Sequence, residues 1–220
     1  MPTAIRDGEV FVLDLGDGEN RFNGAWLERL EELLSEVEAA APCALVTTAT
    51  GKIWSNGLDL EWLGGQGDAA MEFVARVHRL LARVLELNVP SIAAIQGHTF
   101  AAGAMLALAH DERVMRADRG YFCLPEVDIR IPFTAGMNSL IAARLPAQTA
   151  HEAMTTGRRY GGVDAERAGI VDAAVAEEEV LPRAVARATA LAGKDPATLR
   201  TIKQRLYADT LTSLREAQLG

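Results

Sequence analysis

Apolar residues along the chain follow two different spacings, and together these predict a mixed α/β fold. Short apolar runs at Val10 to Leu15, Ala44 to Thr48 and Ser91 to Ile95 have the length and composition of strands. Between these runs, apolar residues recur every three or four positions, as they do on the buried face of a helix. No low-complexity linker interrupts the alternation, which is typical of α/β domains.

Two of the predicted helices have recognisable boundaries. The first is capped near Asn23, and its apolar stripe consists of Leu27, Leu30, Leu34 and Val37. The second is capped by Asp68 and is stopped by Pro90 before the next strand. The predicted buried face of this second helix consists of Met71, Val74, Val77, Leu81, Val84 and Leu85.

After Val175 the pattern becomes almost purely helical. Gly193 ends one predicted helix, and Asp195 as a cap followed by Pro196 opens the last one. The apolar stripe of this last helix consists of Leu199, Ile202, Leu206 and Leu211. Such a helix pair cannot bury its apolar faces alone, so we expect it to pack on the α/β core or on a neighbouring subunit.

Composition narrows the class of protein. With 220 residues, 49% of them hydrophobic, the chain can bury a sizeable core, so we expect one compact domain with a small appendage. It has 22 basic and 30 acidic residues, a net charge of -8 and a pI near 5.1, which argues against a general nucleic-acid binder.

The sequence shows little sign of a secretory signal, a membrane helix or a metal site. The first ten residues lack a basic segment followed by an apolar one, so we expect no secretory signal and a cytoplasmic location. The longest apolar run, Phe100 to Ala109, is shorter than the roughly 20 residues that a membrane helix needs. Cys43 and Cys123 have no metal-ligand spacing, so we expect reduced, structural thiols and no bound metal.

The stretch with the most chemical information begins where the strand Ser91 to Ile95 enters the glycine- and alanine-rich segment Gly97 to Asp111. A turn of small residues that opens an apolar helix leaves backbone N–H groups unpaired at the positive end of the helix dipole. Such donors can stabilise an oxyanion, and Glu126 lies downstream as a candidate base. Together they suggest an enzyme that abstracts a proton next to a carbonyl.

Each of these features also has a purely structural interpretation. The small residues Ala101 to Ala104 could serve tight helix packing, and SNG at Ser55 to Gly57 could be only a turn. Glu126 could be a solvated loop residue, although Pro125 before it would hold its carboxylate in a fixed direction. A Ser/His/Asp triad of Ser55, Asp111 and one of the histidines that flank the apolar helix, His98 or His110, is a further alternative, but the chain has no Gly-x-Ser-x-Gly elbow.

Four segments in the same order give the sequence a family resemblance. The chain resembles the crotonase, or enoyl-CoA hydratase/isomerase, superfamily over nearly its whole length, and within it the Δ3,Δ2-enoyl-CoA isomerases. The segments are SNGLDLEWL (Ser55 to Leu63), AAIQGHTFAAGAMLALAHD (Ala93 to Asp111), LPEVDIRIPF (Leu124 to Phe133) and AERAGIVD (Ala165 to Asp172).

The resemblance implies roles for particular residues. It assigns the catalytic glutamate to Glu126 and the two oxyanion donors to the backbone N–H groups of Leu58 and Ala102. Gly103 would let the thioester approach the helix end closely. The residues implied in binding the coenzyme A moiety are Arg21, Phe22, Ser55, Asn56 and Gly57. Arg21 could approach a phosphate, or it could be an ordinary solvated turn residue.

One position departs from the family pattern. Hydratases of the superfamily carry a second glutamate on the helix after the small-residue turn, whereas this chain has Met105 there, which we expect to line the pocket or the core. Methionine cannot orient or deprotonate water, so we expect isomerisation of a 3-enoyl-CoA to the conjugated 2-enoyl-CoA rather than hydration. Coenzyme A would be part of the substrate, and no separate cofactor is expected.

The resemblance also implies an architecture and leaves alternatives. It predicts a crotonase-like ββα spiral core at residues 1–175 and a helical trimerisation region at residues 176–220, in a homotrimer or a dimer of trimers. One glutamate with one oxyanion hole also serves decarboxylases, dehalogenases and thioesterases of this type, and a hydratase is a further alternative. A non-catalytic binding protein with the same fold is a third reading.

Overall fold

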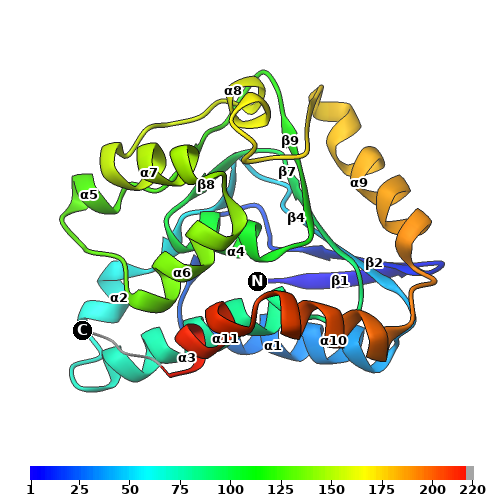
Figure 1. Ribbon diagram of the computed structural model, residues 1–220, viewed down its shortest axis with the longest axis horizontal. Helices are drawn as coiled ribbons and strands as arrows, with labels where there is room; N and C mark the ends of the chain where they lie inside the picture. The colour runs from blue at the N-terminus through cyan, green and yellow to red at the C-terminus, as the bar shows by residue number, and fades with distance from the viewer. Residues whose placement is uncertain (217–220) are drawn as a thin grey trace.

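A six-stranded sheet forms the centre of the molecule in the computed structural model, which describes residues 1–216 (Figure 1). β1 runs antiparallel to β2, and the other neighbouring strands are parallel. The predicted strands at 44–48 and 91–95 have the expected bounds. In spatial order the strands are β1 (Thr3–Asp7), β2 (Val10–Asp14), β4 (Ala44–Thr48), β7 (Ser91–Ile95), β9 (Glu112–Arg116) and β11 (Ala173–Val175).

Two smaller parallel sheets bring the sequence motifs together. One consists of β10 (Phe122–Cys123), β8 (His98–Phe100) and β5 (Ile53–Ser55), and the other of β3 (Arg21–Phe22) and β6 (Gly57–Leu58). The segments before the SNG turn, at the small-residue turn and before Glu126 are therefore neighbours, although they are far apart in the sequence.

Helices cover both faces of the large sheet, and the core is split accordingly. Ala44 and Val46 pack in a cluster with residues of α9, whereas Leu45 between them belongs to the larger cluster with α1, α3 and α4. Burial on both faces explains why these strands are continuously apolar. The helices are α1 (Gly24–Ala39), α2 (Leu60–Gly64), α3 (Ala69–Leu85), α4 (Ala102–Ala109), α5 (Glu126–Ile129), α6 (Ala135–Arg144), α7 (Ala147–Thr156), α8 (Gly162–Arg167), α9 (Glu177–Leu191), α10 (Pro196–Leu206) and α11 (Ala208–Arg215).

Two of the three predicted helix caps form side-chain hydrogen bonds. The side chain of Asn23 accepts from the Trp26 N–H at 3.1 Å, and that of Asp195 accepts from the Thr198 N–H at 2.8 Å. Asp68 does precede α3, but its side chain makes no capping bond.

The predicted stripes of two helices are only partly buried. Met71 on α3 is 48% exposed because it lies at the rim of a cavity and not in the core. The predicted last helix is broken at Tyr207 into α10 and α11, so its stripe does not follow one face. Leu211 is buried, whereas Ile202 and Leu206 are 56% and 68% exposed.

The C-terminal helices pack on the core, which is one of the two arrangements expected. α9 lies against the sheet, and α11 lies against α3 and α6 (Figure 1). On α10, Lys203 is buried and donates to the Asp111 carboxylate at 2.8 Å. The division into 1–175 and 176–220 and the trimeric assembly stay predictions, and residues 217–220 lie outside the described part of the chain.

Two further expectations concern the membrane and the cysteines. Within residues 1–216, no helix combines the length and the apolar character that crossing a membrane would require. Cys43 and Cys123 are buried free thiols, as predicted. Burial raises the pKa of both, that of Cys123 to about 11, so neither has the thiolate character of a reactive cysteine.

Candidate active site

The turn between β8 and α4 has an unusual backbone. Ala101 has φ 51° and ψ -128°, a conformation that residues with a side chain rarely adopt, and it is followed directly by the first helical residue, Ala102. The Ala101 N–H donates to the Cys123 carbonyl at 3.1 Å, which ties the turn to β10. Because the first N–H groups of a helix lack intrahelical partners, this turn aims the donors of Ala102 and Gly103 out of the helix end.

Gly57 brings the second predicted donor next to this helix end. Its φ is +76°, and a Cβ atom there would lie 2.7 Å from the Ala102 nitrogen and 3.1 Å from the Gly103 nitrogen. A Cβ on Gly103 would in turn lie 2.6 Å from the Ser55 carbonyl oxygen. The two glycines therefore allow the SNG turn and the start of α4 to touch, and they place Leu58 on the same cavity as Ala102.

Glu126 lies in the wall of this cavity at the start of α5. It is 6% exposed, and its Oε2 atom is buried without a hydrogen-bond partner in the described structure. Burial raises the pKa of Glu126 to about 7, and a hydrogen bond from its own backbone N–H opposes that rise in part. A carboxylate with this pKa is a stronger base than an exposed one and is still ionised in a large fraction of molecules near neutral pH.

The cavity has a volume of about 740 Å³ and two chemically different parts. Near β3, β5 and β8 its lining carries basic side chains, and near α2, α3, α5 and α6 it is apolar. Among residues 1–216, the lining contains a single carboxylate, that of Glu126. Met105 is buried and lines the same cavity, as predicted. The basic members are Arg21, Lys52, His98 and Arg159.

The basic part contains residues that sequence reasoning missed. Arg159 follows α7 and lies outside every quoted motif, and the fold brings its guanidinium to within 5.7 Å of the centre of the Phe100 ring. The pKa of His98 is lowered, mainly by burial and further by the positive charges of Lys52, Arg119 and Arg159. This part of the cavity is therefore suited to an anionic group.

Not every residue implied in substrate binding reaches the cavity. Arg21 and Asn56 line it, and the Asn56 Oδ1 atom is buried without a partner. Phe22 is fully buried and stacks on Trp26 instead. Ser55 is also fully buried, and its hydroxyl accepts from the Gly57 N–H at 3.1 Å, so it holds the turn from behind.

The alternative Ser/His/Asp triad is not assembled. The Ser55 hydroxyl donates to the Asn20 carbonyl at 2.8 Å. Both ring nitrogens of His110 are engaged elsewhere, with a backbone carbonyl and a threonine hydroxyl, each at 2.8 Å. The Asp111 carboxylate accepts from Lys203 at 2.8 Å. These residues stabilise the fold and share no common site.

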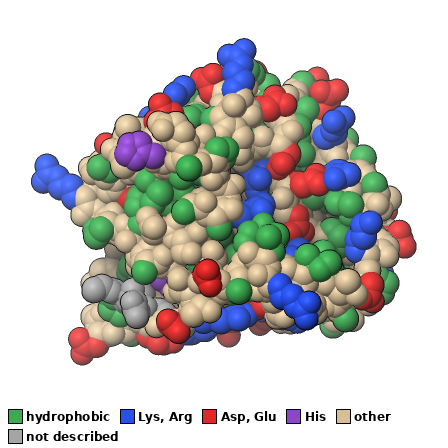
Figure 2. All heavy atoms as spheres, viewed as in Figure 1, with side chains coloured by type: hydrophobic (Ala, Val, Ile, Leu, Met, Phe, Trp, Pro, Cys, Tyr) green, Lys and Arg blue, Asp and Glu red, His purple; other side chains and the backbone are tan. Residues whose placement is uncertain are grey.

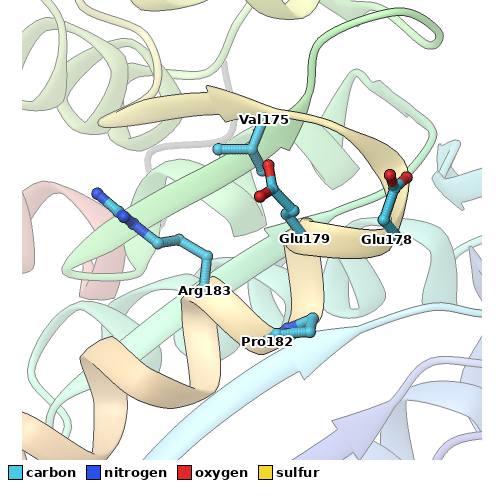
Figure 3. Close-up of a pocket in the computed structure, with 5 residues that line it drawn as sticks. All are labelled: Val175, Glu178, Glu179, Pro182 and Arg183. Atoms are coloured by element: carbon cyan, nitrogen blue, oxygen red, sulfur yellow. The ribbon is translucent and has the colours of Figure 1, made fainter.

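A second, smaller hollow of about 310 Å³ lies between β11 and α9 (Figure 3). Glu178, Glu179 and Arg183 surround it, and the Arg183 side chain extends away from the two carboxylates (Figure 3). All three residues are exposed, so their charges are well solvated. We therefore place the chemistry at the larger cavity.

Comparisons with known proteins identify a family for the chain. A model of the enoyl-CoA hydratase/isomerase family matches residues 8–219. "Enoyl-CoA delta isomerase 3" of Arabidopsis thaliana is 34% identical over 95% of this chain and 93% of its own length. "Enoyl-CoA delta isomerase 2, peroxisomal" of the same organism is also 34% identical, with the same coverage.

Two solved structures of one Mycobacterium tuberculosis protein are similar to this chain. One is described as an enoyl-CoA isomerase and superposes with a TM-score of 0.90 at 27% identity, covering 98% of this chain and 95% of that one. The other is described as a probable enoyl-CoA hydratase and superposes with a TM-score of 0.91 at 26% identity, covering 98% of this chain and 92% of that one. This likeness confirms the crotonase-like α/β fold that the motifs predict.

Proposed function

The chain belongs to the enoyl-CoA hydratase/isomerase family, and within it we propose that the protein is a Δ3,Δ2-enoyl-CoA isomerase. The observation that carries the proposal is that, among residues 1–216, Glu126 is the single carboxylate in the lining of a cavity that Met105 also lines. Adding water across a double bond needs a group that orients the water, and methionine offers no hydrogen bond strong enough for this. Moving a double bond needs only one base that can return its proton.

The proposed reaction follows from this arrangement. The thioester oxygen lies between the backbone N–H groups of Leu58 and Ala102, and Glu126 takes a proton from C2 of the 3-enoyl chain. The electron pair of the broken C–H bond delocalises into a dienolate, whose oxygen the two donors stabilise. Glu126 then returns the proton to C4, so the double bond moves from C3–C4 to C2–C3. No atom is gained or lost.

The basic part of the cavity supports a coenzyme A thioester as the substrate. Arg21, Lys52 and Arg159 all line the cavity, and their charges suit the phosphates of the coenzyme. The basic side chains of the cavity would hold the coenzyme A phosphates, and the apolar side chains of α2, α3 and α5 would hold the acyl chain. No separate cofactor takes part in the proposed reaction.

Incubation with two substrates tests the proposal. We expect a trans-3-enoyl-CoA to give the conjugated 2-enoyl-CoA, which is followed by its ultraviolet absorbance. A trans-2-enoyl-CoA should give little 3-hydroxyacyl-CoA, measured by chromatography. Hydration as fast as isomerisation would favour the hydratase alternative, and absence of both reactions would contradict the proposal and favour another reaction of this family.

The pKa of Glu126 makes a prediction for the pH profile. Because the base must be ionised, kcat/KM for isomerisation should rise about tenfold per pH unit below pH 7 and level off above it. The phosphates of coenzyme A also ionise near pH 6, so the control is a pantetheine thioester without phosphates. A profile that stays flat from pH 5.5 to 8.5 with this substrate would contradict the role of Glu126.

The cellular location stays a prediction. The name of one Arabidopsis relative includes the word peroxisomal, and the sequence of this chain led us to expect the cytoplasm.

A further inference from the structure

Four of the large apolar side chains that lie exposed on this protein belong to the wall of the catalytic cavity. Leu60, Met71, Ile129 and Ile131 line the cavity and are 43–48% exposed. They come from α2, from α3, and from α5 with the residues after it, so the exposure is shared by several elements. The apolar part of the cavity therefore continues to the molecular surface.

The position of this opening is fixed relative to the base. Glu126 and Ile129 are three residues apart on α5, so their side chains lie on the same side of the helix, separated by about 4.5 Å along its axis. An extended chain advances about 1.2 Å per bond, as in an extended peptide. A straight acyl chain that runs along α5 with C4 beside Glu126 would therefore reach Ile129 at about its eighth carbon.

Behind this rim the wall stays apolar. Leu63, Val74 and Met137 line the cavity from α2, α3 and α6, and apart from Glu126 no charged side chain of the described residues is found on these elements where they line it. Apolar side chains are also visible on the surface near α5 and α6 (Figure 2). Exposed apolar side chains in several elements around one opening mark a binding surface.

We propose that this opening is an exit for the acyl tail and that the enzyme selects straight-chain acyl-CoA thioesters longer than about eight carbons. The tail passes between Leu60 and Met71 on one side and Ile129 and Ile131 on the other, and it covers them as it leaves. The inference rests on the proposed function only for the identity of the thioester. A pocket closed at this point would instead exclude long chains.

The experiment measures the binding of saturated acyl-CoA thioesters of 6, 8, 10 and 12 carbons, which cannot isomerise, by calorimetry below their micelle concentrations. A fully buried methylene strengthens binding by about fourfold, so a partly covered tail should lower Kd by about twofold or more per methylene up to 12 carbons. A Kd that stays constant or rises with length would overturn the inference.

Charged substitutions at the rim provide the matched variants. Met71→Glu and Ile131→Glu should each reduce the ratio of the 12-carbon to the 6-carbon affinity by at least tenfold. A carboxylate beside the apolar tail would have to give up its hydration shell when the tail binds. Leu206→Glu is the control, since Leu206 is an exposed leucine on α10 outside the cavity lining, and it should leave the series unchanged. An unchanged ratio in both rim variants would overturn the inference.

A parallel isomerase assay separates this inference from the proposed function. Chain-length-dependent binding without conversion of any 3-enoyl-CoA would refute the isomerase proposal and leave the tail exit intact. Isomerisation of a 6-carbon substrate without any gain in affinity for longer chains would refute the tail exit alone.

Discussion

Replacing Glu126 with glutamine is expected to lower kcat for isomerisation by about 10²–10⁴-fold while the Kd for a saturated acyl-CoA changes little. Glutamine has nearly the same shape but cannot accept the proton from C2, so the loss falls on the chemical step. The measurement is steady-state conversion of a 3-enoyl-CoA alongside calorimetric binding of the saturated analogue. A kcat equal to that of the wild type would show that Glu126 is not the base.

The same substitution has an opposite expected effect on stability, which serves as its folding control. The pKa of Glu126 rises from 4.5 to about 7 on folding, so the native state loses stability between these pH values, where the unfolded chain is already ionised and the folded one is not. The free energy of unfolding is therefore unaffected by this group below pH 4.5, and it falls as the pH rises from 4.5 to about 7. Glu126→Gln should therefore gain up to about 3 kcal/mol relative to wild type between pH 5 and pH 8.

This combination is diagnostic because a structural glutamate would behave differently. If the carboxylate were held by an unseen partner, its removal would destabilise the protein at pH 8, as the loss of a buried hydrogen bond does. Urea unfolding at pH 5 and pH 8 gives the comparison directly. A variant that is more stable than wild type but nearly inactive would show that the Glu126 carboxylate destabilises the fold and is retained because the reaction needs it.

Local sequence signals predicted much of the fold. The strands at 44–48 and 91–95 were identified from apolar runs, and the caps at Asn23 and Asp195 from residue types with a direct local role. Each of these features depends on a few neighbouring residues. Met105 could be predicted locally as well, because it lies on the helix that begins at the small-residue turn, and that helix forms part of the cavity wall.

Errors arose where a residue's environment depends on distant parts of the chain. Met71 fits the apolar stripe of α3 by spacing, but the cavity begins beneath it, so it is half exposed. Ile202 and Leu206 fit a stripe that the break at Tyr207 separates from Leu211. Periodicity identifies apolar faces, but it does not show whether a face meets a core, a cavity or solvent.

The site was predicted in part for the same reason. Glu126 and Ala102 lie in motifs that can be recognised locally, whereas Arg159 carries no local signal and reaches the cavity only through the packing of α7. Phe22 points into the core although Arg21 next to it lines the cavity, since adjacent residues of a strand face opposite sides. Ser55 is fully buried although Ile53, on the same short strand, lines the cavity, and the pairing register shifts between these two residues. Spacing located the turns, and the fold decided which side chains face the ligand.

The second large effect is expected from Gly57→Ala, which should lower kcat by about 10²–10³-fold, the loss typical of one misplaced oxyanion donor. At φ +76° an alanine is strained, and its Cβ would lie 2.7 Å from the Ala102 nitrogen, so either the SNG turn or the start of α4 must move. Gly18→Ala is the matched control, because Gly18 has no positive φ and nothing within 4 Å of an added Cβ.

The position of the contact makes this effect specific to the chemical step. The added methyl group would press on the backbone nitrogens of Ala102 and Gly103 and on the Phe100 carbonyl oxygen, and Gly57 directly precedes Leu58, the other proposed donor. The variant should therefore bind a saturated acyl-CoA with nearly the wild-type Kd and keep the pH dependence set by Glu126, while turnover falls at every pH. A folded Gly57→Ala protein with wild-type turnover would mean that the enolate oxygen is stabilised somewhere other than between the SNG turn and α4.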